Sequence, residues 1–557
     1  HKEISQNFSI LKYEPQLWRM GACRPTVDGT IVGFEKKGKD TYALIDTSDI
    51  HTLMVAAAGT GKTTFFLEPN IEYCCATGMS FISTDTKGDI YRNCGYVAAK
   101  RYGYKISVID LRNPLKSDGF NLLHLVKKYM DEYKNDPMDI SAKAKSERYA
   151  KIVADSIIAT DGDKYGANTY FYDAAKGLIA ALILIIAEYG NDNECHIVSV
   201  LKLMIELLEA KPQKKSQLKS ETYFADLIKL LPPDHKARWL SGAAINNADQ
   251  AALSVVSTAL SRLNSLIDTE TEQILCFNTA IDTETLCNEK CAVFIVLPEE
   301  DRTKYVIANL IIEQISREIY HIADENGGHL DKRIMIYFEE FGTMPPISGV
   351  EAMFSALRSR SVSIVAIIQS FAQLEKNYGK QGSEIIVDNT QLMLFGGFAP
   401  GSSSAEKLSK DLGKQTILTG SISKGNGGKN SGRQSQQLQM TGRELITADE
   451  LKRLPKGTFI CTKTGMSPFK VQLLFYEKLG IRYDEKLNVE IKDVKTVYYT
   501  DRKSIIRSIK MQHNNEQENE MNKDENISDI YELITDYSLE EDDIFAETPS
   551  SKKMIRT

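Results

Sequence analysis

Residues 56–63 have the composition and spacing of a phosphate-binding loop. The stretch is AAAGTGKT, in which Gly61, Lys62 and Thr63 match the consensus G-x-x-x-x-G-K-[ST] and Ala56 stands at the first glycine position. In such a loop, backbone N–H groups and a helix N-terminus hold the phosphates, the lysine reaches the β and γ oxygens, and the hydroxyl ligates Mg²⁺. A glycine-rich turn that binds nothing is the alternative. The lysine and hydroxyl after G-T-G favour a nucleotide site made by Ala58, Gly59, Thr60, Gly61, Lys62, Thr63 and Thr64.

Two glutamates follow a later apolar run. Residues 334–338 predict a buried strand whose C-terminal end carries Glu339 and Glu340. An acidic side chain at this place holds Mg²⁺ through its water shell, and an adjacent glutamate polarises the attacking water. We therefore predict Glu339 as the metal ligand, although most such segments have an aspartate first, and Glu340 as the catalytic base. A pair of exposed glutamates that only ends the strand is the alternative.

An amide and two arginines complete the candidate catalytic residues. Gln369 ends the predicted strand SVSIVAII, where an amide can donate to the γ-phosphate or position the water. Arg358 and Arg360 lie just before that strand. In ring-shaped motors an arginine of the neighbouring subunit neutralises the charge of the transferring phosphoryl group. Either arginine is a candidate for this role, and an ordinary surface arginine is the alternative.

Strands that alternate with helices must position these residues. Apolar runs predict strands at residues 53–55, 79–83, 105–110 and 292–297, the last followed by a helix over residues 305–322. This pattern predicts an α/β fold with a mostly parallel sheet, whose ligands bind beyond the strand C-termini. Between about residues 121 and 288 the apolar residues recur with the period of a helix instead, which indicates an all-α insertion.

The chain of 557 residues divides into five predicted segments. These are an N-terminal entry segment with a β-hairpin (1–50), the first part of the nucleotide-binding domain (51–120), the all-α inserted domain (121–288), the second part of the nucleotide-binding domain (289–480) and a C-terminal extension (481–557).

The C-terminal extension is acidic. Residues 511–557 carry thirteen acidic and four basic side chains, a net of −9, which leaves residues 1–510 at about +2, the difference between −7 and −9. From about residue 513 the segment is polar and poor in aromatic residues, so it cannot bury enough surface to offset its ordering entropy. We expect this tail to be largely disordered, and either solvating or a docking peptide for a partner.

The cysteine content of the chain indicates its cellular compartment. The nine cysteines include no C-x-x-C pair, which argues against a disulfide framework or a standard zinc site and indicates a reducing cytosol. The apolar run at residues 177–187 is about half the ~20 residues that span a bilayer, so we expect a buried helix there. The chain begins with His1 rather than methionine, which suggests a processed or truncated product.

Residues 415–443 are rich in Gly, Ser, Lys and Gln without periodicity, which predicts a mobile loop. Cationic residues in or beside this segment can follow a DNA backbone, since such binding is largely electrostatic. A plain surface loop is the alternative. The cations are Lys414, Lys424, Lys429, Arg433 and Arg443.

Five stretches in this order resemble the type IV coupling proteins, the TraG-type hexameric ATPases of conjugation and type IV secretion. They are AAAGTGKTTFFLEPN, STDTKGDIY, EEFGTMPP, LRSRSVSIVAIIQSFAQL and GRELITADELKRLP, and the resemblance covers about residues 50–475. It implies a RecA-like nucleotide-binding domain interrupted by an all-α domain. It also implies a homo-hexamer and an N-terminal membrane segment that this chain lacks. Ala56 and Glu339 depart from the usual Gly and Asp of the family.

Carried onto this sequence, the resemblance implies an ATPase with ATP and Mg²⁺ as cofactors. Lys62 and Thr63 would bind phosphate and Mg²⁺, Glu339 the metal, Glu340 the attacking water, and Gln369 the γ-phosphate as a sensor. The implied cargo is DNA, expected single-stranded with an attached relaxase, delivered to type IV secretion channel proteins at the cytoplasmic face of the cell membrane. As the chain stands, it is expected to be soluble and cytoplasmic.

Two other functions remain open at the level of the sequence. One is a soluble DNA-pumping ATPase of the chromosome-segregation type, which shares the motor but not the secretion partners. The other is a docking adaptor whose nucleotide site controls assembly and turns over little.

Overall fold

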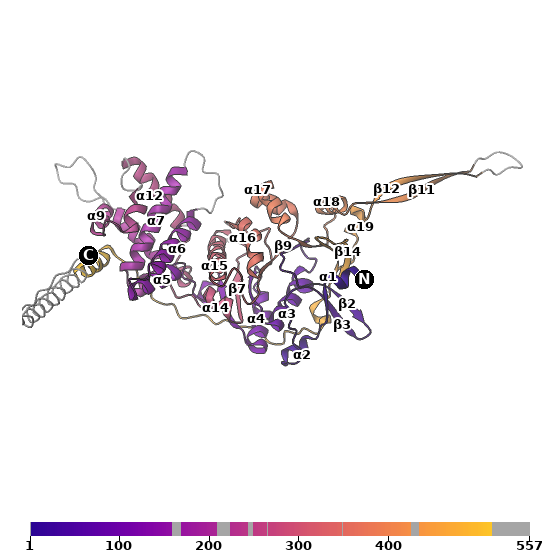
Figure 1. Ribbon diagram of the computed structural model, residues 1–557, viewed down its shortest axis with the longest axis horizontal. Coiled ribbons are helices and arrows are strands. Elements are labelled where there is room, and N and C mark those ends of the chain that lie inside the picture. Colours follow the sequence, from indigo (N-terminus) through magenta and orange to yellow (C-terminus); the bar gives the residue numbers. More distant parts are fainter. Residues whose placement is uncertain are drawn as a thin grey trace, which may run out of the picture.

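A nine-stranded sheet forms the centre of the molecule (Figure 1). The computed structural model describes residues 2–158, 169–208, 223–242, 249–264, 266–347, 349–424 and 434–514. The strands of this sheet are β4 (Thr52–Ala56), β5 (Ser80–Asp85), β6 (Lys105–Asp110), β7 (Cys291–Val296), β8 (Ile334–Phe338), β9 (Val362–Ile368), β10 (Leu392–Gly396), β13 (Thr458–Lys463) and β14 (Phe469–Gln472).

The strand order is β14-β13-β10-β4-β9-β8-β5-β7-β6. All neighbours from β10 to β6 pair in parallel, while β13 and β14 are antiparallel at one edge. The predicted α/β class with a mostly parallel sheet is therefore confirmed. Strand β9 lies between β4 and β8, so the strand that ends at Gln369 separates the loop strand from the strand with the two glutamates.

The central part of the sheet is buried on both faces, which explains why β4, β7, β8 and β9 are apolar at nearly every position. In β9, Ile364 and Ala366 face one core and Val365 and Ile367 face the other. Buried residues of the first core come from α15 (Tyr305–Glu325), α16 (Val350–Ala356) and α17 (Phe371–Asp388), and those of the second from α3 (Glu68–Thr77) and α4 (Asp89–Tyr102).

A small N-terminal sheet packs against the second core. Its strands β1 (Ser9–Lys12), β2 (Thr30–Lys37) and β3 (Asp40–Asp46) have the order β1-β3-β2, and β2 and β3 form the predicted hairpin. Asn70 joins this sheet to α3: its Oδ1 accepts a hydrogen bond from Ile31 N (2.7 Å), and its Nδ2 donates to Ile31 O (3.2 Å) and Phe66 O (2.9 Å). The amide thus satisfies strand groups beside the β-bulge of β2.

The predicted all-helical insertion is present between β6 and β7 (Figure 1). Its helices are α5 (His124–Asn135), α6 (Ile140–Ile158), α7 (Thr169–Tyr189), α8 (Ile197–Leu208), α9 (Tyr223–Leu230), α10 (Lys236–Leu240), α12 (Asp249–Asn264), α13 (Glu272–Leu275) and α14 (Thr283–Asn288).

Helix α7 is a long, largely apolar helix of the insertion. By length and composition it is one helix of the described residues that could cross a membrane, with a mean hydropathy of 1.7 in its most apolar window. In the fold it contacts α5, α6, α8, α10 and α12, and 67% of that window is buried. The predicted buried helix at residues 177–187 is confirmed, because α7 is a core helix here.

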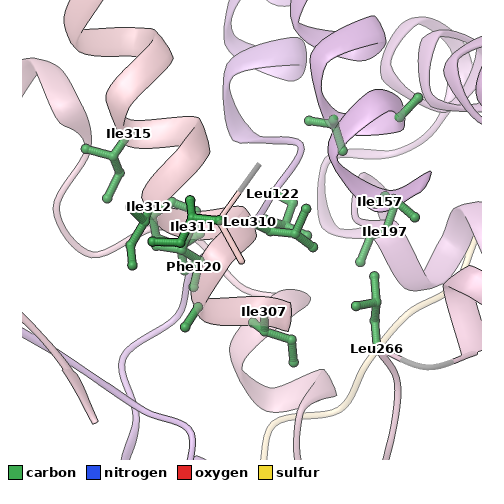
Figure 2. Close-up of a cluster of buried hydrophobic side chains, with 14 of the residues drawn as sticks. Phe120, Leu122, Ile157, Ile197, Leu266, Ile307, Leu310, Ile311, Ile312 and Ile315 are labelled. Atoms are coloured by element: carbon green, nitrogen blue, oxygen red, sulfur yellow. The ribbon is translucent and has the colours of Figure 1, made fainter. Parts of the chain in front are cut away.

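The insertion and the sheet domain share one hydrophobic core (Figure 2). Helix α15 presents apolar side chains to residues on the connection from β6 and on the insertion helices, so its burial depends on both parts. The cluster drawn in Figure 2 includes Phe120, Leu122, Ile157, Ile197, Leu266, Ile307, Leu310, Ile311, Ile312 and Ile315.

The chain after the sheet returns to the insertion. Leu487 N donates to Arg92 O (2.7 Å) on α4, and further along His196 Nε2 lies 2.9 Å from Tyr498 O. Residues 502–514 are helical and bury Ile505. The predicted disordered tail falls almost entirely outside the described residues, which end at 514 in this region.

The segment predicted as a mobile loop contains a two-stranded ribbon, so that prediction is wrong for its described part. Strands β11 (Lys414–Lys424) and β12 (Gln434–Glu444) pair antiparallel over eleven residues each. The alternation of apolar and polar residues is weak there, since the side chains whose burial is described, at 414–420 and 438–444, are largely exposed. Lys414 and Arg443 pair with Glu444 (3.9 Å) and Glu450 (2.7 Å), and Lys429 and Arg433 lie outside the described residues.

The remaining short elements are α1 (Lys2–Asn7), α2 (Pro15–Arg19), α18 (Ser403–Asp411), α19 (Ala448–Lys452), the π-type turn η1 (Lys62–Leu67) and the 3₁₀ turns η2 (Pro114–Lys116), η5 (Asp192–Glu194), η6 (Arg302–Lys304), η7 (Leu357–Arg360) and η8 (Tyr476–Leu479). The nine cysteines are free thiols, of which Cys23 is exposed and the others buried.

The shared core predicts that the insertion and the sheet domain unfold together. Ile311 of α15 is fully buried, so Ile311→Ala should cost about 2–5 kcal/mol and lower the melting temperature of one common transition. Scanning calorimetry checks this, with Ile385→Ala on the exposed side of α17 as the control of small effect. Two separate transitions, only one of which moves, would contradict a shared core.

Candidate active site

The loop after β4 has the backbone of a phosphate cradle. Gly59 and Gly61 have φ values of +75° and +88°, in the left-handed region that favours glycine. A Cβ on Gly61 would also lie 2.6 Å from the ring of Phe65. Thr60 Oγ1 donates to Ala57 O (2.7 Å), which closes the turn before η1 begins at Lys62. The N–H groups at the start of this turn are therefore available to an anion.

The alanine at the first consensus position has a structural explanation. Ala56 is the last residue of β4 and lies in register with Gly396 of β10. It is 1% exposed and is not among the described non-glycine residues with positive φ. Since the strand backbone needs no glycine there, the loop tolerates this departure from the consensus.

The other predicted loop residues surround the turn. Ala58 is exposed at the edge of the loop, beside Gly59. Thr64 Oγ1 lies within hydrogen-bond distance of Gly61 O (3.3 Å), so it stabilises the first turn of the helix from within the loop.

Glu339 brings three segments together at the carboxyl edge of the sheet. Its side chain is 3% exposed, and its Oε1 accepts a hydrogen bond from Thr63 Oγ1 (2.8 Å). Its Oε2 accepts from Thr86 N (3.1 Å) and Thr86 Oγ1 (3.2 Å), and its own N–H donates to Thr84 Oγ1 (2.9 Å). Burial raises the pKa of Glu339, and the hydrogen bonds from Thr86 and Thr63 oppose this rise.

Glu340 is the second acceptor of the site. Lys62 Nζ lies 3.5 Å from its Oε1, and Gln369 Nε2 donates to its Oε2 (3.2 Å). Gln369 is itself oriented by Gln373, whose Oε1 accepts from Gln369 N (3.0 Å). The structure thus collects Lys62, Glu340 and Gln369 from three adjacent strand ends. A carboxylate oriented in this way can polarise a water beside bound phosphate.

The two candidate arginines lie elsewhere. They precede β9, whereas Gln369 follows it, so about 20 Å of strand separates them from the loop of their own chain. Arg360 pairs with Asp324 (3.1 Å) and lies over the ring of Tyr320, while Arg358 is exposed. Neither arginine contacts the site residues of the same chain, so a role for them requires the site of another subunit.

Thr86 and Arg112 are site residues that motif reasoning missed. The guanidinium of Arg112 donates to Lys87 O (2.9 Å), to Thr86 O and to Leu297 O (3.4 Å). It therefore fixes the loop after β5 against the end of β7, and with it the Thr86 groups that hold Glu339. The hydroxyl run S-T-D-T before a Lys-Gly pair is the only sequence signal for Thr86, and Arg112 has none.

Asp85 plays a structural part in the same loop. Its carboxylate accepts hydrogen bonds from Gly88 N (2.6 Å), Tyr91 N (2.9 Å) and Lys87 N (3.2 Å), which orders the start of α4. Burial raises the pKa of Asp85 to about 6 despite these bonds, and the charge of Glu339 adds to the rise.

Glu68 lies behind the loop, at the first position of α3. It is 3% exposed; Asn93 Nδ2 approaches its Oε1 (3.4 Å), and its Oε2 has no partner among the described residues. Burial raises the pKa of Glu68 to about 7, and the charges of Asp89, Glu339 and Asp85 add to this rise.

Comparison with known proteins gave a family and a set of similar folds. The family profile described as "Type IV secretory system Conjugative DNA transfer" matches residues 19–519. A search of curated protein sequences gave no match.

Three solved structures of one bacterial protein are similar to this chain. The unbound conjugative coupling protein TrwBdeltaN70 has a TM-score of 0.56 at 14% identity, over 87% of this chain and 96% of that chain. TrwB in complex with ADP and Mg²⁺ has a TM-score of 0.54 at 13% identity, over 84% of this chain and 94% of that chain. TrwB in complex with the non-hydrolysable ATP analogue ADPNP has a TM-score of 0.54 at 12% identity, over 88% of this chain and 96% of that chain. At these identities the likeness shows the fold.

The buried carboxyl of Glu68 predicts a pH-dependent stability. Because its pKa is raised from 4.5 in the unfolded chain to about 7 in the fold, the destabilising effect is absent below pH 4.5 and grows as pH rises to 7. Glu68→Gln should therefore stabilise the protein by up to about 3 kcal/mol at pH 8 and by little at pH 4.5. Melting temperatures at both pH values check this.

The matched control is Glu384→Gln on the exposed face of α17, which should change neither melting temperature. Equal melting of wild type and Glu68→Gln at pH 8 would contradict the assignment of a destabilising buried charge.

Proposed function

This chain belongs to the type IV secretory system conjugative DNA transfer family, the TraG/TrwB coupling proteins, and on that premise we propose that it is an ATP-hydrolysing motor. The motor recruits DNA or a protein–DNA substrate and drives its delivery to a type IV secretion channel. The match over residues 19–519 supports the transfer role. The similar TrwB structures, one in complex with ADP and Mg²⁺ and one with an ATP analogue, support the nucleotide.

The observation that carries the hydrolytic part is the meeting of the loop with the two glutamates. Thr63 Oγ1 lies 2.8 Å from Glu339, and Lys62 Nζ lies 3.5 Å from Glu340. Gln369 reaches the same Glu340 carboxylate from β9. One edge of the sheet thus carries three sets of groups: N–H donors for phosphate, an oxygen pair suited to a metal ion, and a carboxylate oriented by an amide. This is the edge at which α/β proteins bind ligands.

The donor set at this edge fits Mg²⁺. A hydroxyl and a carboxylate are hard oxygen ligands, and Mg²⁺ is usually held by one or two such groups plus substrate phosphates and water rather than by an all-protein cage. Consistently, no group of three or more His, Cys, Asp or Glu side chains among the described residues could hold a metal alone. When bound, the ion would neutralise charge on the β- and γ-phosphates.

Each residue then has a distinct part in the reaction. Lys62 and the loop N–H groups bind and orient the phosphates, and Thr63 and Glu339 hold the metal. Glu340 accepts hydrogen bonds from the attacking water and polarises it. Gln369 senses the γ-phosphate through its amide and passes the change to residues 370–374. The catalytic effect is positioning and charge stabilisation of the water attack.

The assembly we propose is a homo-hexamer with sites at subunit interfaces. The distance of Arg358 and Arg360 from the loop of their own chain is consistent with an arginine supplied in trans. Single-stranded DNA with its relaxase is the proposed cargo. We place the motor at the cytoplasmic face of the cell membrane, in contact with the channel proteins. The family membership favours this transfer role over a chromosome-segregation pump.

Steady-state ATP hydrolysis with and without single- and double-stranded DNA tests the motor. We expect DNA to stimulate turnover in the wild type. Glu340→Gln should lower kcat by about 10²–10⁴-fold while ATP still binds, because only the base is removed. Lys62→Ala should weaken ATP binding as well, because it removes a phosphate contact made in both ground and transition states.

The matched control is Glu384→Gln, an exposed carboxylate on α17 that should leave kcat unchanged. Wild-type turnover in Glu340→Gln would refute the assigned base. Absence of both DNA stimulation and DNA retention at low salt would refute a DNA motor. Nucleotide-dependent partner binding and transfer that survive Glu340→Gln would instead identify a docking adaptor.

A further inference from the structure

A cavity of about 330 Å³ lies where the insertion meets the sheet domain, and none of the candidate active-site residues lines it. Its walls come from α5 and α6 on one side and from α14 and α15 on the other. Apolar and aromatic side chains make part of the lining, namely Leu125, Tyr129, Tyr149 and Ile322. Tyr129 and Tyr149 are stacked, with ring centroids 5.6 Å apart.

Two unpaired acceptors meet beside this cavity. Glu318 of α15 lines it with a side chain that is 3% exposed, and its Oε1 has no hydrogen-bond partner among the described residues. His124 does not line the cavity but lies next to Glu318: its Nε2 also has no partner among the described residues and is 3.7 Å from the same oxygen, which is too far for a direct hydrogen bond. His124 Nδ1 lies 2.8 Å from Asn121 O, so it carries the proton and Nε2 presents a lone pair. A donor with several N–H bonds would satisfy both acceptors.

The charge of the lining favours a cation. Of its seven Asp, Glu and Lys side chains, five bear carboxyl groups and two are lysines, and both lysines are already paired: Lys128 with Glu284 (2.8 Å) and Lys145 with Glu325 (2.5 Å). Glu318 is thus one of the carboxyl groups left without a lysine. The other two are Glu132 and Asp282.

The chemistry of the walls narrows the class of cation. Among the described residues no set of three His, Cys, Asp or Glu side chains could hold a metal ion. Aromatic and aliphatic walls suit methylene groups and also attract an ammonium to their π-faces. We propose that this cavity binds a linear aliphatic diamine or polyamine. One ammonium lies against Glu318 and His124, the methylene chain runs along Leu125 and Ile322, and a second ammonium meets the acidic rim.

Binding of an amine at this cavity is coupled to the release of a proton. Burial raises the pKa of Glu318 to about 8, although hydrogen bonds of its carboxyl group with the side chains of Thr283 and Gln314 oppose this rise. The empty cavity therefore holds Glu318 largely protonated at pH 7, and binding an ammonium releases that proton. Burial lowers the pKa of His124, so the imidazole stays neutral above pH 7. Affinity should therefore rise roughly tenfold between pH 7.0 and pH 8.5. The charged or titratable groups facing Glu318 are His124 and Lys128 on α5, Tyr149 on α6, Asp282 just before α14, and Cys287 on α14.

Isothermal titration calorimetry of the full chain, freed of nucleic acid, tests the site with putrescine and spermidine. We expect saturable binding of one amine per chain that tightens with pH, with proton release visible as a difference between buffers of different ionisation enthalpy. The uncharged isostere 1,4-butanediol should not bind. Bound amine should also raise the melting temperature.

Glu318→Gln preserves the shape of the side chain and should weaken amine binding at pH 8.5 at least tenfold and abolish its pH dependence. The control Glu490→Gln changes the same charge on an exposed residue far along the chain and should bind as the wild type does. Amine binding that survives Glu318→Gln, equal binding of the diol, or no binding to folded wild type at millimolar amine would each overturn the proposal. Because the cavity shares no residue with the nucleotide site, these outcomes leave the proposed motor function untouched.

Discussion

The carboxylate of Glu339 holds the site together. A buried charge is costly unless hydrogen bonds compensate it, and here the compensation comes from Thr63 on one side and Thr86 on the other. The same contacts therefore fix the start of the loop helix, the end of β8 and the loop after β5 in one geometry. Arg112 extends this network to the end of β7 through the carbonyl of Thr86. The Thr63 hydroxyl, the proposed metal ligand, is oriented by this network before any ligand arrives. Such preorganisation lowers the reorganisation that the proposed phosphoryl transfer would need.

The sheet and the insertion are mechanically continuous. Helix α15 follows β7, covers the sheet face beneath the site, and buries residues such as Ile311 and Ile315 in the core that the insertion shares (Figure 2). Its Glu318 also lines the cavity at the junction. The burial of α15 therefore depends on both the sheet and the insertion, because its apolar side chains pack in the core that the two parts share.

Much of the site was predictable because the carboxyl ends of parallel strands share one edge. Lys62, the pair Glu339 and Glu340, and Gln369 follow three separate apolar runs, and the sheet brings them within contact of one another or of Thr63. Thr86 and Arg112 escaped prediction because their roles depend on backbone carbonyls and a buried carboxylate oxygen, which no residue pattern records. The β11–β12 ribbon escaped because its side chains, where their burial is described, are largely exposed, and burial is what makes strand alternation visible. The proposed role of Arg358 and Arg360 needs a second subunit, and a single chain does not contain that contact.

The affinity of the full chain for the ATP analogue ADPNP, measured with and without Mg²⁺, tests most directly whether Glu339 organises the metal site. In the wild type Mg²⁺ should strengthen binding by about tenfold or more, because Thr63 and Glu339 hold the ion against the phosphates. In Glu339→Gln that enhancement should largely disappear while binding without Mg²⁺ persists. The same Mg²⁺ enhancement in both proteins would contradict the account.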